Sequence, residues 1–283
     1  MLTNFNRSLE LMDRFETDNL RLLCYDFAEQ YSGIYKTYEY SRLCTIIQGE
    51  KFITSNKSKV KYDATQYLLL PSESTVQMEI NQPTKAIVYE LSSQLIKQAN
   101  EKVSNEYSID YKILSQNEYY IGDINMELKE NLNRIIFKLL KKSENFECII
   151  DLYAQELVYN LISNKGARQV LDLEISNPVN MAIRYMNGNY MQPISINQLS
   201  HSLNMSEANF CQHFKRITSM TPNEYLTNVK LKKAKGLLMQ TSVTEAAFNL
   251  GYENISYFIA LFKKRYGITP KQYQMMNNNL DLY

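Results

Sequence analysis

The sequence lacks residues on which several classes of protein depend. It has no tryptophan and two histidines, His201 and His213, twelve positions apart. A metalloenzyme usually draws on clustered imidazoles, so neither metal-dependent catalysis nor a cofactor is expected. The four cysteines form no CxxC pair: Cys24, Cys44, Cys148 and Cys211. This scatter is typical of reduced thiols in a cytoplasmic protein rather than of disulfides or a zinc site.

Long apolar runs are also missing. No stretch approaches the roughly 18 residues that a membrane span requires, and residues 1–7 have no apolar run behind a basic head. We therefore expect a cytoplasmic protein. With 283 residues, 45% of them hydrophobic and 22% charged, the chain is long enough for two globular domains.

The net charge of +1 is unevenly distributed. From Asn177 onwards the chain has 11 Lys+Arg against 5 Asp+Glu, whereas the preceding part has 20 against 25. A basic domain attached to an acidic one is typical of a nucleic-acid-binding protein with a separate control domain. A basic surface can also serve solubility alone, so charge does not decide the function.

Residues 42–91 show the alternation and turn signals of β-structure. Residues 43–47, a turn at Gln48-Gly49-Glu50 and residues 51–54 predict a strand, a tight glycine turn and a return strand. Further strands are expected at 59–62, 67–70, 75–80 and 85–91. Strands at such short, regular spacing predict a small sandwich or barrel.

The periodicity then becomes helical. Apolar residues predict helices over about 128–139 and 149–161, the second ending near Gly166. Such a helical pair either forms a dimerisation surface or covers one side of the β-domain, and the sequence leaves both open. Residues 166–177 are expected to be a linker, and Pro178 begins a run that is helical throughout.

That helical run contains an internal repeat. FKRITSMTPNEY at 214–225 aligns with FKKRYGITPKQY at 262–273, a constant offset of 48. Thr221 and Thr269 each open a capping box with proline in the first helical position. Asn204 and Gly251 supply the left-handed residue that a sharp turn needs. Each copy is therefore predicted to be a helix-turn-helix.

These residues resemble the AraC/XylS family of bacterial transcription regulators. The resemblance covers about 178–273 and is carried by ISINQL at 194–199, FK at 214–215, TP at 221–222, GY at 251–252, SYF at 256–258 and GITP at 267–270. A weaker resemblance links Leu43-Cys44, Gln48-Gly49, residues 67–70 and QELVY at 155–159 to the cupin-like N-terminal domain of one AraC subfamily.

The resemblance implies an α+β protein with an N-terminal small β-barrel (cupin-like) and helical hairpin, and a C-terminal all-α domain with two helix-turn-helix units. The expected boundaries are a regulatory and dimerisation domain at 1–165, with the barrel at about 20–92 and helices at about 92–165, the linker at 166–177 and the DNA-binding domain at 178–283.

Base readout is expected from the polar face of the helix at 206–218, where Asn209 or Gln212 suits an adenine edge. The second copy has Ala260 where the family often has arginine, which leaves its base reading in doubt. The candidate DNA-binding residues are Ser206, Glu207, Asn209, Gln212, His213, Lys215, Arg216, Lys230, Asn254, Ser256, Tyr257, Lys263 and Lys264.

The expected function is regulation of transcription, as an activator and without covalent chemistry. The expected partners are double-stranded promoter DNA, RNA polymerase, a second copy of the chain in a homodimer and an unidentified small-molecule effector. The candidate effector-binding residues are Tyr38, Tyr40, Arg42, Tyr67 and Gln77. The alternative is a ligand-free N-terminal domain used for dimerisation or for contact with a partner protein.

Overall fold

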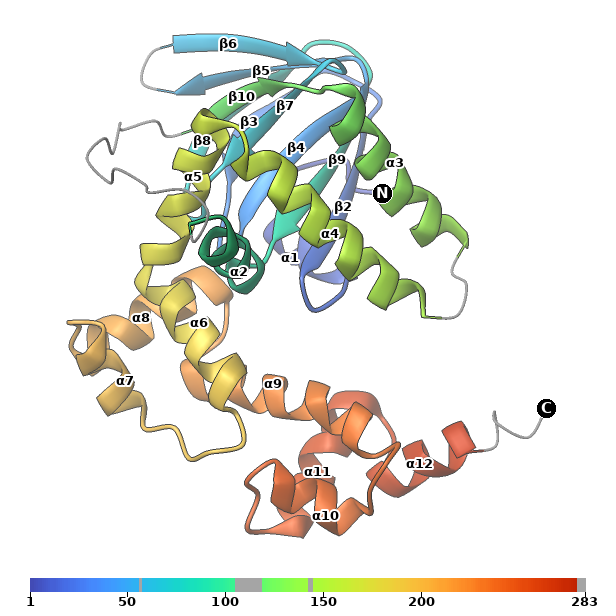
Figure 1. Ribbon diagram of the computed structural model, residues 1–283, viewed down its shortest axis with the longest axis vertical. Helices are drawn as coiled ribbons and strands as arrows, with labels where there is room; N and C mark the ends of the chain where they lie inside the picture. The colour runs from blue at the N-terminus through green and yellow to red at the C-terminus, as the bar shows by residue number, and fades with distance from the viewer. Residues whose placement is uncertain (56–57, 105–118, 142–144, 279–283) are drawn as a thin grey trace. The chain divides into compact units, whose positions relative to one another are not determined.

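The N-terminal part of the chain is rich in β-structure and the C-terminal part is helical (Figure 1). The computed structural model describes residues 1–55, 58–104, 119–141 and 145–278. The chain divides into two units, Met1–Asn180 and Met181–Tyr283, and each is described by itself. The α+β class predicted from the sequence is confirmed.

The strands of the first unit form two sheets rather than one closed barrel. The larger has the order β1 (Phe15–Glu16), β2 (Leu20–Phe27), β9 (Thr84–Leu91), β4 (Ser41–Gln48), β7 (Gln66–Leu70) and β10 (Tyr120–Asp123). The smaller has the order β3 (Tyr31–Lys36), β8 (Thr75–Ile80), β5 (Glu50–Ser55) and β6 (Ser58–Asp63). The expected barrel is thus corrected to a pair of packed antiparallel sheets.

The turn at Gly49 produces this difference. The expected strand and return strand both form, but β4 pairs with β7 and β9, whereas β5 pairs with β6 and β8. Gly49 has φ +88°, and a Cβ there would lie 2.4 Å from Thr84 Oγ1. Because only glycine adopts this conformation at so close an approach, the chain leaves one sheet and enters the other at Gly49.

The larger sheet is buried on both faces. Along β7, Leu68 and Leu70 belong to the core between the two sheets, whereas Tyr67 and Leu69 belong to a second core beneath helices. Four helices contribute to the second core: α2 (Ser93–Ser104), α3 (Met126–Lys141), α4 (Phe146–Ile162) and α5 (Lys165–Ser176). The predicted helical pair, α3 and α4, therefore covers one face of this sheet.

Residues 166–177, expected to be a linker, are instead mostly helical. The Asn164 side chain caps α5 by accepting hydrogen bonds from the N–H groups of Gly166 (2.9 Å) and Ala167 (3.2 Å). Val170 and Leu171 of α5 are fully buried, as is Ala167. Gly166 therefore lies at the start of a packed helix rather than at the end of one, and the helical spacing of the apolar residues outweighs the glycine.

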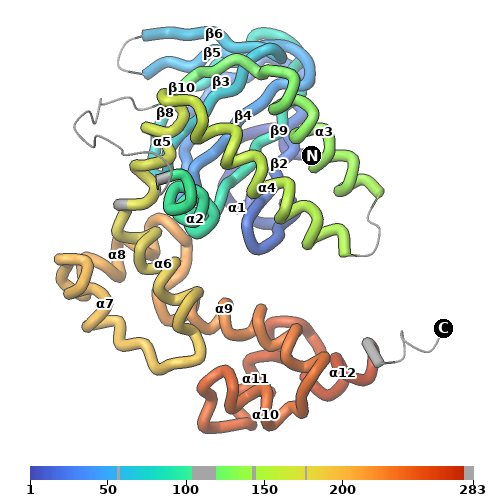
Figure 2. Tube along the Cα trace, viewed as in Figure 1, coloured from blue at the N-terminus to red at the C-terminus, as the bar shows by residue number. Residues whose placement is uncertain are grey.

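A short α1 (Arg7–Met12) precedes the sheets. All other helices of the described chain follow α5 without intervening strands (Figure 2). Beyond α5 the described chain forms α6 (Pro178–Asn189), α7 (Ile196–Ser202), α8 (Glu207–Thr218), α9 (Pro222–Leu237), α10 (Val243–Asn249), α11 (Ile255–Tyr266) and α12 (Pro270–Asn278). No helix within the described ranges is both long and apolar enough to cross a lipid bilayer.

Candidate nucleic-acid interface

The second unit contains two helix-turn-helix elements, α7–α8 and α10–α11, that begin their second helix in the same way. Ser206 caps α8, and its Oγ accepts a hydrogen bond from Asn209 N at 3.4 Å. Asn254, 48 positions later, caps α11, and its Oδ1 accepts one from Tyr257 N at 3.0 Å. The equivalent caps align the first turns of the two helices with the sequence repeat.

The turns of the two copies are equivalent as well. Asn204 and Gly251 precede α8 and α11 with φ +57° and φ +72°. The predicted left-handed residues are therefore confirmed. After the second helix, Ser219 in the first copy and Gly267 in the second have φ +63° and φ +80°.

The predicted capping boxes also form. Thr221 N donates to Glu224 Oε2 at 2.8 Å, and Glu224 N donates to Thr221 Oγ1 at 3.3 Å. In the second copy, Thr269 N donates to Gln272 Oε1 at 2.9 Å, and Gln272 N donates to Thr269 Oγ1 at 3.3 Å. Because the reciprocal bonds satisfy backbone donors at the helix start, they fix where α9 and α12 begin.

The α8 helix has one buried and one exposed face. Phe210 and Phe214, one turn apart, are fully buried, and their ring centroids lie 5.5 Å apart. Asn209 and Gln212 are exposed on the other side of the helix. Exposed amides at helical spacing are the groups that bond adenine edges in the major groove.

The remaining candidates on α8 have different surroundings. Lys215 and Arg216 are exposed in the last turn, whereas His213 is half-buried. Glu207 Oε2 accepts a hydrogen bond from Asn197 Nδ2 of α7 at 2.9 Å. Glu207 therefore links the two helices of the first copy.

The α11 helix repeats the buried face of α8 but not its exposed chemistry. Phe258 and Phe262 are fully buried, like their counterparts in the first copy. At the repeat offset of 48, Asn209 corresponds to Tyr257, which is 57% exposed, and Gln212 corresponds to Ala260. Ser256 and Ala260 are exposed, as are the two lysines Lys263 and Lys264. The second face thus offers a hydroxyl, a ring and a methyl group in place of two amides.

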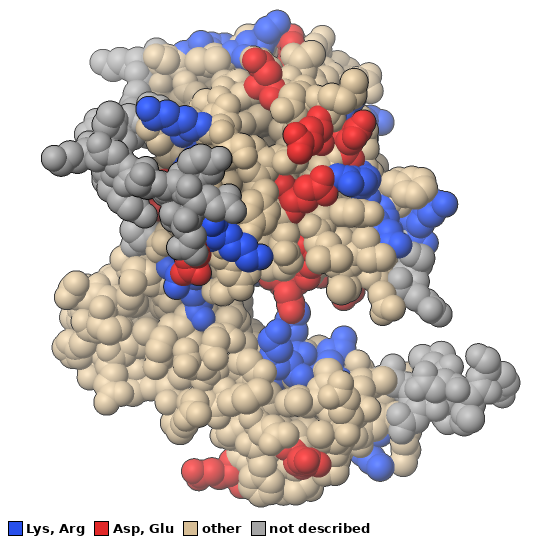
Figure 3. Space-filling view, viewed as in Figure 1, with Lys and Arg blue, Asp and Glu red and all other residues tan. Residues whose placement is uncertain are grey.

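The basic run on α9 is divided among different surroundings. Lys230 Nζ lies 5.2 Å from the centroid of the Tyr252 ring, and burial lowers the pKa of Lys230. Lys235 Nζ lies 5.5 Å from the Tyr266 ring and 5.7 Å from the Tyr273 ring. Basic side chains gather over α9 in Figure 3, while acidic side chains lie over α10. Lys230 and Lys235 thus help join α9 to the second copy through cation–π contacts.

The structure does not bring the five candidate effector-binding residues together. Tyr38 and Tyr40 stack against the guanidinium groups of Arg7 and Arg21, each at 4.1 Å. Tyr67 lies in the helix-covered core. Gln77 bonds Ser32 Oγ on the outer side of the smaller sheet at 2.9 Å. Tyr38 also lies 5.9 Å from the Arg42 guanidinium, so Tyr38, Tyr40 and Arg42 surround one group of charges, whereas strand alternation places Tyr67 and Gln77 on other faces.

Arg42, the fifth candidate, lies within a buried network of charges. Its Nη2 lies 2.6 Å from Glu10 Oε2 and 2.7 Å from Glu90 Oε1. Burial alone would raise the pKa of Glu90, but Arg42 and neighbouring guanidiniums lower it to about 2. The network comprises three guanidiniums and three carboxylates: Arg7, Arg21, Arg42, Glu10, Glu39 and Glu90. This network was not predicted from the sequence, although charged residues within the apolar runs of β2, β4 and β9 are its signal.

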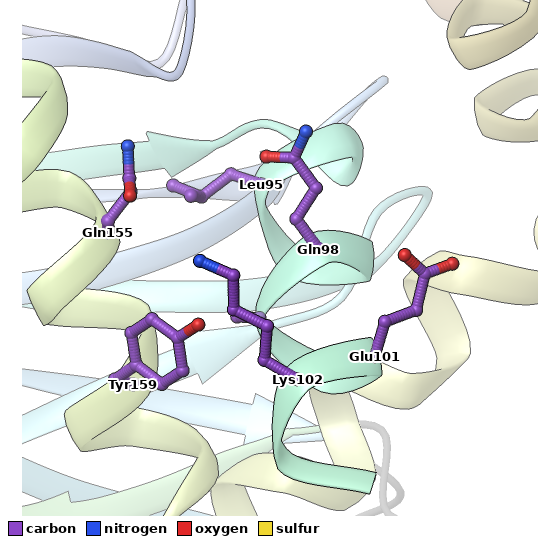
Figure 4. Close-up of a pocket in the computed structure, with 7 residues that line it drawn as sticks. Leu95, Gln98, Glu101, Lys102, Gln155 and Tyr159 are labelled. Carbon is purple, nitrogen blue, oxygen red and sulfur yellow. The ribbon is translucent and has the colours of Figure 1, made fainter. Parts of the chain in front are cut away.

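A cavity of about 330 Å³ opens between α2 and α4 (Figure 4). Lys102 extends from α2 towards Gln155 and Tyr159 of α4, whereas Glu101 points away from them. This cavity was not predicted from the sequence. In the part of the chain that the structure describes, no group of three or more His, Cys, Asp or Glu side chains is placed to hold a metal ion.

The chain combines a two-sheet unit with a second unit that contains two tandem helix-turn-helix elements. These features define the class as a two-unit helix-turn-helix protein. The family model described as "AraC-type transcriptional regulator N-terminus" matches residues 19–169, and the model described as "Helix-turn-helix domain" matches residues 199–276. The first match alone covers more than half of the chain, so the chain belongs to the family of AraC-type transcriptional regulators. The resemblance read from the sequence is thereby confirmed.

Curated relatives align over part of their length. The HTH-type transcriptional regulator YdeC of Bacillus subtilis is 23% identical over 175 residues, which are 60% of this chain and 59% of the relative. The lactose operon transcription activator of Staphylococcus xylosus is 25% identical over 160 residues, 54% of this chain and 57% of the relative. The chain thus spans a little under three-fifths of the length of these relatives.

A solved structure is similar over most of the chain. Fatty-acid-bound ToxT from Vibrio cholerae has a TM-score of 0.46 and 11% sequence identity, covering 93% of this chain and 97% of that chain.

Proposed function

We propose that this protein regulates transcription by binding double-stranded promoter DNA in a sequence-specific manner through α8 and α11. The observation that carries the proposal is the duplicated helix-turn-helix, in which both second helices begin at equivalent caps and bury equivalent phenylalanine pairs. In helix-turn-helix proteins the second helix lies in the major groove. Two such helices joined by α9 would read two segments of one duplex.

The two helices have different tasks in this proposal. Asn209 and Gln212 of α8 bond base edges and set the sequence preference. Basic side chains on both helices neutralise phosphates: Lys215, Arg216, Lys263 and Lys264. The amide-free face of α11 adds backbone contacts and an apolar contact from Ala260, which supplies orientation more than specificity.

Two substitutions in α8 test this division. Gln212→Ala should weaken binding to the selected site by about 1–3 kcal/mol and leave binding to random DNA nearly unchanged, because it removes a base contact. Arg216→Ala should weaken binding to every sequence and reduce the slope of affinity against salt, because it removes a phosphate contact. Fluorescence anisotropy on a site chosen from a randomised duplex library measures both effects.

Gln240→Ala is the matched control, since this exposed amide lies outside both recognition helices. Equal losses on specific and random DNA for Gln212→Ala would refute its role in base readout. A relaxed sequence preference in Arg216→Ala would refute its assignment to phosphate.

We further propose that a small-molecule effector bound by the first unit controls activation. The first unit has two cores of its own, as a separate control domain requires. The similar protein from Staphylococcus xylosus is an activator, which favours activation over repression here. Transcription in vitro with RNA polymerase, with and without this protein, tests the direction; repression of the bound promoter would contradict it.

We also propose that the chain dimerises through the helical hairpin. Three large apolar side chains on α3 and α4 are strongly exposed: Phe137 at 59%, Leu140 at 78% and Leu152 at 57%. Large exposed apolar side chains favour contact between protein surfaces. A second copy is the proposed occupant, because a regulator that binds paired half-sites uses its own two-fold symmetry.

A further inference from the structure

The segment before α1 inserts Phe5 into a cage of four aromatic rings between the two sheets. The centroid of the Phe5 ring lies 4.7 Å from Tyr35, 5.1 Å from Tyr31, 5.3 Å from Phe27 and 5.6 Å from Tyr25. Phe5 is partly buried whereas Tyr25 and Tyr35 are fully buried, so the Phe5 ring lies on the solvent side of the cage. A benzyl group held in this way occupies its site as a small ligand would.

Few backbone bonds hold this segment to the sheet. Leu2 N donates to Cys24 O at 2.8 Å, and Asp26 N donates to Leu2 O at 2.8 Å. Phe5 N donates to the Tyr31 hydroxyl at 3.4 Å, which is long for a hydrogen bond. Because β2 keeps its full pairing with β9, the Phe5 side chain can leave the cage without opening the larger sheet.

A buried lysine lies beside the same rings. Lys51 Nζ is 5.3 Å from the centroid of Phe27, 5.5 Å from Tyr25 and 5.7 Å from Phe5, and the residue is 2% exposed. Within the described part of the chain, Lys51 has no carboxylate or hydrogen-bond acceptor as a partner. A buried ammonium group without an anion is strongly destabilising, so a position that needed only packing would carry an apolar residue.

The groups that face Lys51 do not supply the missing anion. Burial raises the pKa of Cys44, Tyr25 and Tyr62, so all three are neutral near pH 7. Tyr62 lies opposite Lys51 in the pairing of β5 with β6, and its buried hydroxyl has no hydrogen-bond partner among the described residues. An ammonium and a hydroxyl, both without acceptors, thus lie on neighbouring strands.

The buried charge network does not compensate Lys51 either. Its three guanidiniums are matched by three carboxylates, of which Glu10 and Glu90 pair with Arg42. Burial lowers the pKa of Lys51 to about 8, and no carboxylate opposes that effect. The Lys51 ammonium, beside the aromatic cage, therefore has no compensating anion among the described residues.

We propose that the ring cage and Lys51 form a binding site for a small aromatic carboxylate, and that Phe5 fills this site when the ligand is absent. The ring of the ligand takes the place of the Phe5 side chain. Its carboxylate pairs with the Lys51 ammonium and accepts a hydrogen bond from the Tyr62 hydroxyl. The inference rests on the proposed effector control for its biological role, and on the cage and Lys51 for its chemistry.

Phenylacetate is the probe, because it joins the benzyl group of Phe5 to a carboxylate, and phenylacetamide is its neutral counterpart. Isothermal titration at pH 7 of the full chain carrying Phe5→Ala should show phenylacetate binding at least about tenfold more tightly than phenylacetamide, because an ion pair forms. The wild-type chain should bind phenylacetate more weakly than Phe5→Ala, since Phe5 must first leave.

The double variant Phe5→Ala, Lys51→Met should lose the preference for the anion. Phe5→Ala combined with Lys61→Met should keep it, because Lys61 is exposed and pairs with Glu50 at the surface. Equal affinities of Phe5→Ala for the two probes, a preference that survives Lys51→Met, or no binding of phenylacetate to Phe5→Ala would each overturn the site.

A measurement on the wild-type chain guards against misfolding of the variants. Titration of the Lys51 side chain by NMR should show saturating phenylacetate raising its pKa above about 8, because the ion pair favours the ammonium form. An unchanged pKa at saturation would overturn the site. Selective binding that leaves affinity for promoter DNA unchanged would confirm the site and refute its role in effector control.

Discussion

Two kinds of buried charge in the first unit differ in what surrounds them. Arg42 is fully buried between Glu10 and Glu90, so each charge has a partner within 2.7 Å. Lys51 is equally buried but contacts ring faces. A paired buried charge can leave the stability of the fold unchanged, whereas an unpaired buried charge lowers it. An unpaired charge therefore persists where binding or catalysis requires it.

Replacing Lys51 should therefore stabilise the protein below about pH 8. The pKa of Lys51 is lowered from 10.5 to about 8, so the unfolded chain binds more protons than the folded chain between these values. The contribution of Lys51 to the free energy of unfolding of the wild type therefore rises with pH across that window and is lowest below pH 8. Lys51→Met should raise the free energy of unfolding at pH 7 by about 3 kcal/mol, and by progressively less up to pH 10.5.

Urea unfolding at pH 6, 7, 8, 9 and 10 measures the difference between the variant and the wild type. Comparing these two chains cancels the effect of the buried tyrosines, whose pKa values are raised by burial in both. Lys61→Met, which replaces an exposed lysine, is the control for the substitution itself. A difference that stays constant from pH 7 to pH 10 would contradict the prediction.

Single residues of the two units were not equally predictable from the sequence. Phe210 and Phe214 define the buried side of α8, so the exposure of Asn209 and Gln212 followed from helical spacing. Both faces of the larger sheet are buried, so the same reasoning could not tell that Tyr67 and Arg42 lie on opposite faces.

At the scale of elements, the two helix-turn-helix copies end their second helix in the same left-handed conformation with different residues. Ser219 has φ +63° and donates its N–H to Lys215 O, and Gly267 has φ +80° and donates its N–H to Lys263 O. A serine is strained there and a glycine is not. The first copy thus carries a conformational strain that the second avoids.

Ser219→Gly should stabilise the second unit by about 0.5–1 kcal/mol, because it removes this strain. Gly267→Ser should destabilise it by a similar amount, since no atom lies within 4 Å of the added Cβ and the effect is conformational. Thermal unfolding of the full chain, followed by helical circular dichroism, measures both. Changes of the same sign in the two variants would contradict the prediction.

Local signals predicted most elements well, and tertiary context explains the exceptions. The caps at Thr221 and Thr269 set helix starts within a few residues, so α9 and α12 were predictable. The partner of a strand is not a local property, so Gly49 was read as a hairpin turn although it joins two sheets. The same holds for α5, which is helical because the second core, beneath the helices, buries one of its faces.

At the scale of the whole molecule, the proposed dimer depends on the exposed apolar side chains of the hairpin. Leu140→Lys should convert the dimer to a monomer, because it places a charge in the proposed contact. Gln94→Lys is the control, as Gln94 is an exposed polar residue of α2, outside the hairpin. Sedimentation velocity at micromolar concentration distinguishes the two states. A Leu140→Lys chain that remains dimeric would contradict the proposed interface.

The strand order of the larger sheet has a consequence in time. Since β9 lies between β2 and β4, the centre of the sheet requires β2 to pair with β9. This pairing brings Leu20 beside Leu91 and Phe27 beside Thr84. Contacts so distant along the chain make folding slow, whereas helices that contact their sequence neighbours form quickly. During synthesis, β2 therefore cannot pair with β9 until some sixty further residues have been made. We expect folding of the first unit to limit the rate at which the whole protein reaches its native state.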